Sequence, residues 1–189
     1  MTIRGGSVSA ARPLILEARG GSIPTSPLSL RFDLIDSGRF SALNAEWHRT
    51  LPHIAARNTI SPCFGAWHDG ECYAVAGWSN PVARALPQRT WLELRRFAVA
   101  PDAPRFTASR MLGFMVRWIR LRMSHIERLI SYSDSDEHNG TIYKAVDWRQ
   151  HQLPASGGAW NNRQRWNRTA LRKANKIRWE FECRKAGVG

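Results

Sequence analysis

Apolar and polar residues alternate along several stretches of this chain, which is typical of half-buried β-strands. The alternation predicts strands over residues 29–35 and 176–183, and further strands are predicted over residues 91–99 and 128–133. Two more strands are predicted on either side of Asp69-Gly70, over residues 63–68 and 71–78, because a two-residue Asp-Gly link is a strong signal for a β-hairpin. These stretches supply the strands of a sheet.

Between the strands, apolar residues recur at helical spacing. Ser37 can cap a first helix, whose apolar positions are Phe40, Leu43 and Trp47. Thr107 or Ser109 can cap a second helix, whose apolar face carries Leu112, Met115, Val116, Ile119 and Met123. Shorter helices are predicted over residues 141–148 and 169–174.

The order of these elements is strand, helix, hairpin, long strand, helix, strand, helix and strand. It predicts a single α/β (α+β) domain over residues 29–185, with a mixed, mostly antiparallel sheet between helices, after an N-terminal arm of residues 1–28. This order is similar to the GNAT fold of acyl-CoA N-acetyltransferases. In that fold the cofactor pyrophosphate lies at the N-terminus of the helix after the fourth strand, because free N–H groups there attract anions. The usual Gly-rich motif of that helix start is absent from residues 103–109.

Charge adds a second observation, since 28 Lys and Arg residues outnumber 15 acids, giving a net charge of +13. Residues 149–185 contain ten Lys or Arg and only two acids. Such a concentration favours a polyanionic partner, of which double-stranded DNA is the first candidate. Aromatic and basic residues mix in this C-terminal segment, and the candidate DNA contacts are Arg163, Arg165, Trp166, Arg168, Arg172, Lys173 and Lys176.

A membrane is not favoured as the partner, because the chain has no run of eighteen apolar residues. The three cysteines lack metal-ligand spacing and are interpreted as reduced thiols of a cytosolic protein. An exposed sheet edge would be compatible with a homodimer.

Acid-base groups gather in one stretch, residues 130–143. It begins as an apolar strand and continues into Asp134, His138 and Tyr143, with a glycine turn at Gly140. Loops beyond the carboxyl ends of strands commonly carry the chemistry of α/β proteins. This small acidic island in a basic chain is therefore the candidate reaction centre, although Asp136 and Glu137 are interpreted as solvated loop acids.

The motifs as a set resemble those of the Mom family of phage DNA-modification proteins. The resemblance rests on Glu93-Leu94-x-Arg96-Phe97, Ser109 at a helix start, Ser131-Tyr132-x-Asp134, and His138-x-Gly140-Thr141-Ile142-Tyr143-x-Ala145-x-x-Trp148, with His48 and Cys63-Phe64-Gly65 earlier and Lys173 to Trp179 later. It implies a GNAT-like fold, action in the host cell cytoplasm, and transfer of a carbamoylmethyl group to the exocyclic amino group of adenine in phage DNA. The modification protects the DNA from host restriction, and the family is associated with an acyl-CoA-like donor and with iron.

For four of the candidate catalytic and binding residues, a purely structural role is the alternative to a functional one. Tyr143 is a candidate general acid or hydrogen-bond donor, or a core residue. Asp134 is a candidate to orient the adenine amino group or accept its proton, or a turn residue. Arg96 would bind a donor carboxylate or phosphate, or pair with Asp134 or Glu93. Ser109 would bind an anion, or simply cap its helix.

The remaining candidates lie in loops or at helix ends. His48 is a candidate base or metal ligand, and His138 either binds substrate or stabilises its own loop. Arg105 and Gly140 are assigned to substrate or donor binding. Because an adenine amino group in a duplex is hard to reach, base flipping is an expected corollary. The alternatives to DNA modification are an acyl-CoA-dependent N-acetyltransferase acting on a small molecule or protein, and a non-enzymatic DNA-binding protein.

Overall fold

A computed structural model describes residues 22–48, 51–54, 59–135, 138–151 and 176–183. A short 3-10 helix, η1, spans Pro27–Ser29. The α-helices are α1 (Ser37–Trp47), α2 (Thr107–Arg122) and α3 (Thr141–Lys144). The strands are β1 (Arg31–Leu34), β2 (Cys63–His68), β3 (Glu71–Ser79), β4 (Trp91–Val99), β5 (Arg128–Asp134), β6 (Arg149–His151) and β7 (Lys176–Glu182).

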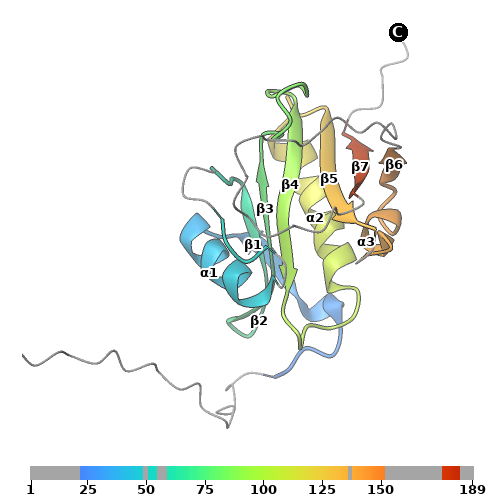
Figure 1. The fold of residues 1–189 in the computed structure, drawn as a ribbon. Helices are drawn as coiled ribbons and strands as arrows, with labels where there is room; N and C mark the ends of the chain where they lie inside the picture. Colours follow the sequence, from blue (N-terminus) through green and yellow to red (C-terminus); the bar gives the residue numbers. More distant parts are fainter. Residues whose placement is uncertain (1–21, 49–50, 55–58, 136–137, 152–175, 184–189) are drawn as a thin grey trace, which may run out of the picture.

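These strands form one sheet in the order β1-β2-β3-β4-β5-β7-β6 (Figure 1). Every neighbouring pair is antiparallel except β4 and β5, which are parallel and are connected through α2. The predicted fold class, a mostly antiparallel sheet with helices on both faces, is therefore confirmed. The predicted hairpin is also present, because Asp69 and Gly70 both have positive φ, 46° and 82°, as a tight Asp-Gly turn requires.

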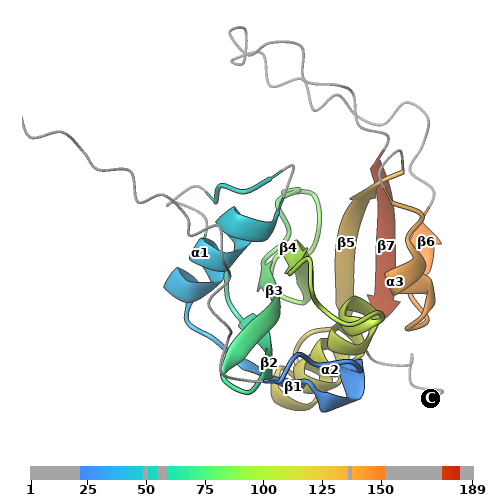
Figure 2. The ribbon, with the colours of Figure 1, turned by 90° about the horizontal axis from the view of Figure 1, so that it is seen from below.

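The helices divide between the two faces of the sheet (Figure 2). On one face α1 packs its Phe40 against Val75 and Ala98 of the central strands, in a small core. On the other face α2 and α3 cover the main core, in which the apolar side of α2 meets Trp78, Leu94 and Leu129. The sheet thus separates two chemically distinct sides, and each site residue can be assigned to one of them.

The central strands β4 and β5 pair over only part of their length. Their register joins Trp91–Leu94 to Arg128–Ser131, and beyond Leu94 and Ser131 no further pairs between these two strands are formed. Past that point β4 pairs only with β3, and β5 only with β7. Because the two strands are parallel, their carboxyl ends separate at the same edge of the sheet, where α/β proteins place ligands.

An irregularity in β4 coincides with this separation. Gly77 lies opposite Arg96 and Trp78 lies opposite Leu94, so Arg95 is an extra residue in β4. Such a bulge interrupts the alternation of side chains. Leu92 and Leu94 face the main core, whereas four residues later Ala98 faces α1. The bulge therefore places Arg96 on the α1 side, in phase with Ala98.

Two helix caps differ from the sequence prediction. Asp36, not Ser37, caps α1, and its carboxylate accepts a hydrogen bond of 2.8 Å from the backbone N–H of Arg39. Neither Thr107 nor Ser109 caps α2, because the capping position is Phe106 in a left-handed conformation, with no side-chain cap. A polar residue near a helix start predicts a cap only within a residue or two.

Two elements after β5 also differ from the prediction. The helix predicted over residues 141–148 ends at Lys144. Its last predicted residues lead into β6, a short edge strand of three exposed residues that the alternation does not reveal. The helix predicted over 169–174 lies outside the described residues.

Candidate active site at the separation of two parallel strands

Tyr143 and Ser131 connect α3 to β5 where β4 and β5 part. Their hydroxyl oxygens lie 2.8 Å apart, and the Ser131 hydroxyl also lies 3.5 Å from the carbonyl oxygen of Leu94 on β4. Tyr143 is only 6% exposed, and burial raises the pKa of its phenol. It is therefore neutral near pH 7 and keeps a proton that it can donate in a hydrogen bond.

The ring of Tyr143 is held by aromatic neighbours. It stacks on Trp179 with 5.2 Å between ring centroids and an interplanar angle of 12°, and its centroid lies 5.5 Å from that of Trp148. The indole N–H of Trp179 donates to the Ser133 hydroxyl at 2.9 Å. Ser131 and Ser133 thus orient α3 and β7 from one face of β5, and this ordering fixes the position of the phenol.

Gly140 opens α3 in a conformation that favours glycine. Its φ is +67°, and a Cβ at this position would overlap the indole ring of Trp179. The structure therefore explains Gly140 by the close approach of Trp179 to the backbone, while its predicted role in binding remains untested.

On the opposite face, the structure brings three predicted site residues together. His48 ends α1, and the pKa of its imidazole is lowered first by burial and then by the positive charges of Arg96 and His138. The backbone N–H of Leu51 donates to His48 Nδ1 at 3.2 Å. A neutral imidazole that accepts at Nδ1 carries its proton on Nε2, so His48 is a hydrogen-bond donor at that atom.

Arg96 also belongs to this group, and only part of its guanidinium is hydrogen-bonded. Its Nη1 donates to the carbonyl oxygen of Arg95 at 2.7 Å, whereas its Nε is buried and has no hydrogen-bond partner among the described residues. Burial, then the charge of Arg95, lowers its pKa, and Glu93 opposes that effect. The ion pair that the structure forms near this position joins Glu93 to Arg95, at 3.3 Å. A buried N–H without a partner is a donor available for an anionic ligand.

Asp134 occupies the last position of β5, which extends one residue beyond the predicted strand over 128–133. Its backbone carbonyl accepts from the N–H of His138 at 2.9 Å, which closes the loop between β5 and α3 and sets His138 near the strand end. Lys176 lies opposite Asp134 in the register of β5 and β7. Asp134 and His138 therefore come from one turn, and their placement follows from the local backbone.

The start of α2 lies at the carboxyl end of β4. The Ser109 hydroxyl donates to the carbonyl oxygen of Phe106 at 3.1 Å, and the Thr107 hydroxyl donates to that of Pro104 at 2.7 Å. The first turn of α2 contains no acid, and the Arg105 guanidinium lies 5.3 Å from the centroid of the Phe106 ring. The helix start is electropositive, but the Ser109 proton is directed to the backbone and not outward.

The other predicted DNA contacts, Arg163, Arg165, Trp166, Arg168, Arg172 and Lys173, lie outside the described residues, as do Asp136 and Glu137. Lys176 is described and is exposed at the start of β7.

Sequence reasoning assigned no role to Ser131 or Trp179, which the structure places in contact with Tyr143. The available signal was the pair of serines at alternate positions, 131 and 133, on the core-facing side of an apolar strand.

The described residues do not form an iron site. No three His, Cys, Asp or Glu side chains within the described ranges gather closely enough to hold a metal ion. His48 would also need a free lone pair on Nε2, which the hydrogen bond from Leu51 to Nδ1 disfavours in the neutral ring. None of the helices that the structure describes has the length and hydropathy of a membrane span.

Known structures with the same arrangement define the class of fold. The ribosomal-protein-S18-alanine N-acetyltransferase from Escherichia coli matches with 13% identity and a TM-score of 0.57, over 84% of this chain and 97% of that one. The Salmonella typhimurium protein yncA, solved with its cofactor acetyl-CoA, matches with 12% identity and a TM-score of 0.57, over 85% and 97%. A Bacillus subtilis acetyltransferase in complex with CoA matches with 11% identity and a TM-score of 0.55, over 81% and 98%.

These similarities show that the chain has a GNAT-like fold, as predicted. No curated protein matches the chain. The model of the Mom protein family matches residues 30–180, which is most of the sequence. The chain therefore belongs to the Mom protein family, and the resemblance seen in its motifs is confirmed.

Proposed function

We propose that this protein is a DNA-modifying enzyme that transfers a carbamoylmethyl group to the exocyclic amino group of adenine. The observation that carries the proposal is the match to the Mom family over residues 30–180. The net charge of +13 supports a DNA substrate, because phosphate contacts require basic side chains. The modified DNA would be phage DNA in the host cytoplasm, where the group shields it from restriction enzymes.

The proposed transfer forms a bond between the adenine nitrogen and the methylene carbon of the carbamoylmethyl group. It breaks the bond between that carbon and the donor, whose leaving group takes the electron pair, and the adenine nitrogen loses one proton. Asp134, at the end of β5, is the proposed acceptor of that proton or the group that orients the nitrogen. Tyr143 is proposed to donate a hydrogen bond at the reacting group, since burial keeps its phenol protonated.

The cationic group on the α1 side is proposed to hold the negative charge of the substrate or donor. Arg96 has a buried Nε without a described partner, and His48 lies near enough to Arg96 and His138 to be affected by their positive charges. A carboxylate or phosphate oxygen at Arg96 Nε would satisfy that donor. Of the two structural alternatives for Arg96, Glu93 forms its 3.3 Å ion pair with Arg95.

An acyl-CoA-like donor would place its phosphates at the start of α2. That helix start has no acid in its first turn and has Arg105 beside it, so its charge suits phosphates. Two of the GNAT-like structures contain acetyl-CoA or CoA in their own sites. The described residues lack a Gly-rich loop there, so Arg105 and the free N–H groups of the first turn would be the contacts. No step is assigned to iron, because the described residues do not form a site for it.

Mass spectrometry of DNA nucleosides tests the proposal directly. The chain is expressed in bacteria that supply the required metabolites, and the DNA is digested to nucleosides. We expect an adenosine derivative heavier by one carbamoylmethyl group in place of hydrogen. Unmodified adenine in all DNA from cells that contain the folded protein would contradict the proposal.

The fold supports a second candidate function, N-acetylation of a small molecule or protein. Calorimetry with acetyl-CoA and nucleoside analysis together separate the two functions. Acetyl-CoA binding without any modified adenine would favour the acetyltransferase.

A further inference from the structure

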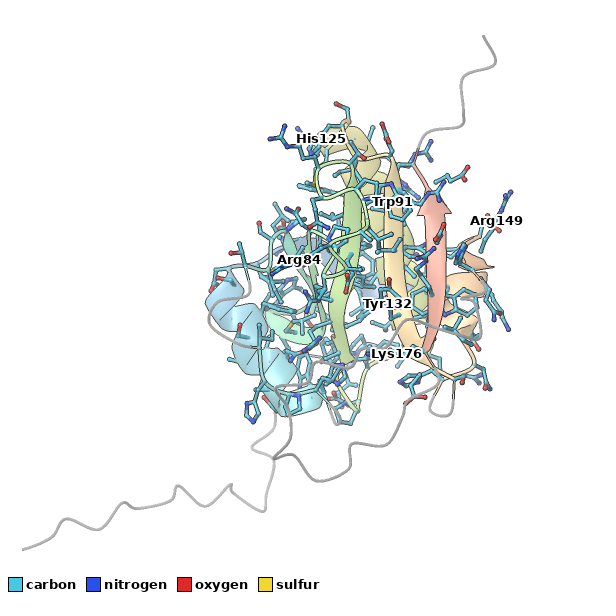
Figure 3. All side chains as sticks on the ribbon, turned by 45° about the horizontal axis from the view of Figure 1, so that its top comes forward. Arg84, Trp91, His125, Tyr132, Arg149 and Lys176 are labelled. Atoms are coloured by element: carbon cyan, nitrogen blue, oxygen red, sulfur yellow. The ribbon has the colours of Figure 1, made fainter. Side chains whose placement is uncertain are left out.

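A charged surface continues beyond the candidate site across β5 and β7. Trp179 and the serines of β5 face the main core, so the intervening residues Tyr132 and Arg178, which lie opposite each other, face the α1 side. Figure 2 shows α1 beside this surface, over the strands of the hairpin, with no described helix above β5 and β7. Tyr132 and Lys176 both lie on the face viewed in Figure 3. We define this surface by Tyr132, Arg178 and Glu180 and call it the β5–β7 face.

Arg178 is held from two sides on the β5–β7 face. Its Nη2 lies 2.7 Å from Glu180 Oε1, and on the other side Arg178 lies opposite Tyr132, where burial raises the pKa of the phenol and the nearby guanidinium offsets part of that rise. The side chains of Arg178 and Glu180 are only 13% and 12% exposed. The carboxylate of Glu180 is in turn balanced by Arg128, whose Nη1 lies 2.9 Å from Glu180 Oε2. The guanidinium of Arg178 is therefore fixed in position before any ligand arrives.

One donor of this fixed guanidinium is unused. Arg178 Nε is buried and has no hydrogen-bond partner among the described residues, and the same is true of Arg96 Nε on β4. The two arginines lie on the same side of the sheet, on strands that flank β5. A buried N–H that lacks an acceptor is unfavourable, and an anionic oxygen is the acceptor that best suits a guanidinium. Two such donors on one face indicate a substrate that presents more than one anionic group.

We infer that Arg178 contacts a phosphate of the DNA strand that enters the site, and that Tyr132 and Glu180 are positioning residues for its guanidinium. The nature of the polyanion rests on the proposed function. Phosphates repeat along a strand, so a strand whose target base lies at Arg96 would present further phosphates to the β5–β7 face. Arg178 adds a described residue to the DNA contacts, separate from the basic segment that precedes β7.

The test is the salt dependence of DNA binding. Fluorescence anisotropy with a short duplex, at several KCl concentrations, gives the slope of log K against log[KCl] for the wild type, Arg178→Gln and Arg178→Lys. Arg122→Gln is the matched control, because Arg122 is exposed at the end of α2 on the other side of the sheet. Circular dichroism melting confirms that each variant is folded, and Tyr132→Phe, which removes only a hydroxyl, is a milder variant at the same contact.

We expect Arg178→Gln to weaken binding about tenfold and to reduce the slope by about 1, because one phosphate contact is lost. Arg178→Lys should keep the slope and lose affinity, since it keeps the charge without the Nε donor. Tyr132→Phe should lose less affinity than Arg178→Gln, and Arg122→Gln should bind as the wild type does. Unchanged affinity and slope in folded Arg178→Gln would overturn the inference.

Failure of this inference differs from failure of the proposed function. If wild-type cells contain modified adenine and Arg178→Gln binds DNA normally, the phosphate contact is wrong and the modification stands. If no modified adenine forms but Arg178→Gln loses one unit of slope, the contact stands and the modification is wrong. If wild-type protein does not bind the duplex at all, the inference fails. An unchanged slope for DNA with weaker binding of CoA would assign Arg178 to the donor and overturn the inference.

Discussion

The phenol oxygen of Tyr143 lies 2.8 Å from the hydroxyl oxygen of Ser131, where the parallel strands β4 and β5 stop pairing. This contact joins the short helix α3 to the centre of the sheet. It places a protonated phenol beside the opening between the strands, with Ser131 as its hydrogen-bond partner.

Replacement of Tyr143 by Phe should abolish adenine modification while leaving the fold intact. The variant keeps the aromatic stack on Trp179 and loses one buried hydrogen bond, which should lower the free energy of unfolding by about 1 kcal/mol. Nucleoside mass spectrometry and urea denaturation measure the two effects. Ser131→Ala is the matched control, since it removes the partner hydroxyl and leaves the phenol in place. Full modification by Tyr143→Phe would show that the phenol has no chemical role.

Gly140→Ala should be strongly destabilising. The new Cβ would overlap Trp179 and would force a non-glycine residue to keep a φ of +67°, so we expect a loss of about 2–4 kcal/mol in the free energy of unfolding. Gly70→Ala is a close control, because Gly70 has a φ of +82° and a Cβ there would have no atom within 4 Å. Gly70→Ala should cost only about 1 kcal/mol. Equal losses in the two variants, measured by chemical denaturation, would contradict the role given to Trp179.

His48 should make stability depend on pH. Its folded-state pKa is below the unfolded value near 6.5, so the unfolded chain binds the proton more readily, and stability falls as the pH drops below about 6.5. His48→Gln should therefore show a smaller loss of melting temperature between pH 7.5 and pH 5 than the wild type. His125→Gln, at an exposed position after α2, should retain the wild-type loss. A steeper loss in His48→Gln would reverse the sign of the prediction.

Asn44 should be needed to position His48. Asn44 is fully buried, and its amide donates to the carbonyl oxygens of Leu51 and Pro52 at 3.2 and 2.9 Å. The N–H of Leu51 is the group that bonds His48 Nδ1. Asn44→Ala should lower the free energy of unfolding by about 2 kcal/mol, because it leaves a small cavity and unpaired carbonyls.

Asn44→Ala should also reduce modification in cells kept at a temperature where the protein stays folded. Glu46 lies two residues further along α1 and its side chain is exposed, so Glu46→Ala is a suitable control on the same helix. If Asn44→Ala modified adenine as the wild type does, the segment after α1 would not be needed for the site.

Local patterns explain which parts of the fold were predictable. The Asp69-Gly70 turn depends on neighbouring residues alone, and the structure contains it together with the two strands that it joins. The helix α2 was predicted from its apolar stripe, because a stripe of that spacing can only be buried as a helix against the sheet. Short elements such as β6 escaped prediction, since three exposed residues carry no period.

The sequence by itself determined which chemical groups this protein has. These are a strongly basic chain, a small group of acid-base residues after a strand, and motifs sufficient to indicate the family. Only the tertiary structure decided how those residues combine. The bulge at Arg95 places Arg96 on the α1 side of the sheet, where its charge acts on His48, and the close approach of Trp179 places Tyr143 against Ser131. Both relations depend on strand register and long-range packing, which join residues far apart in the chain and leave no trace in local periodicity.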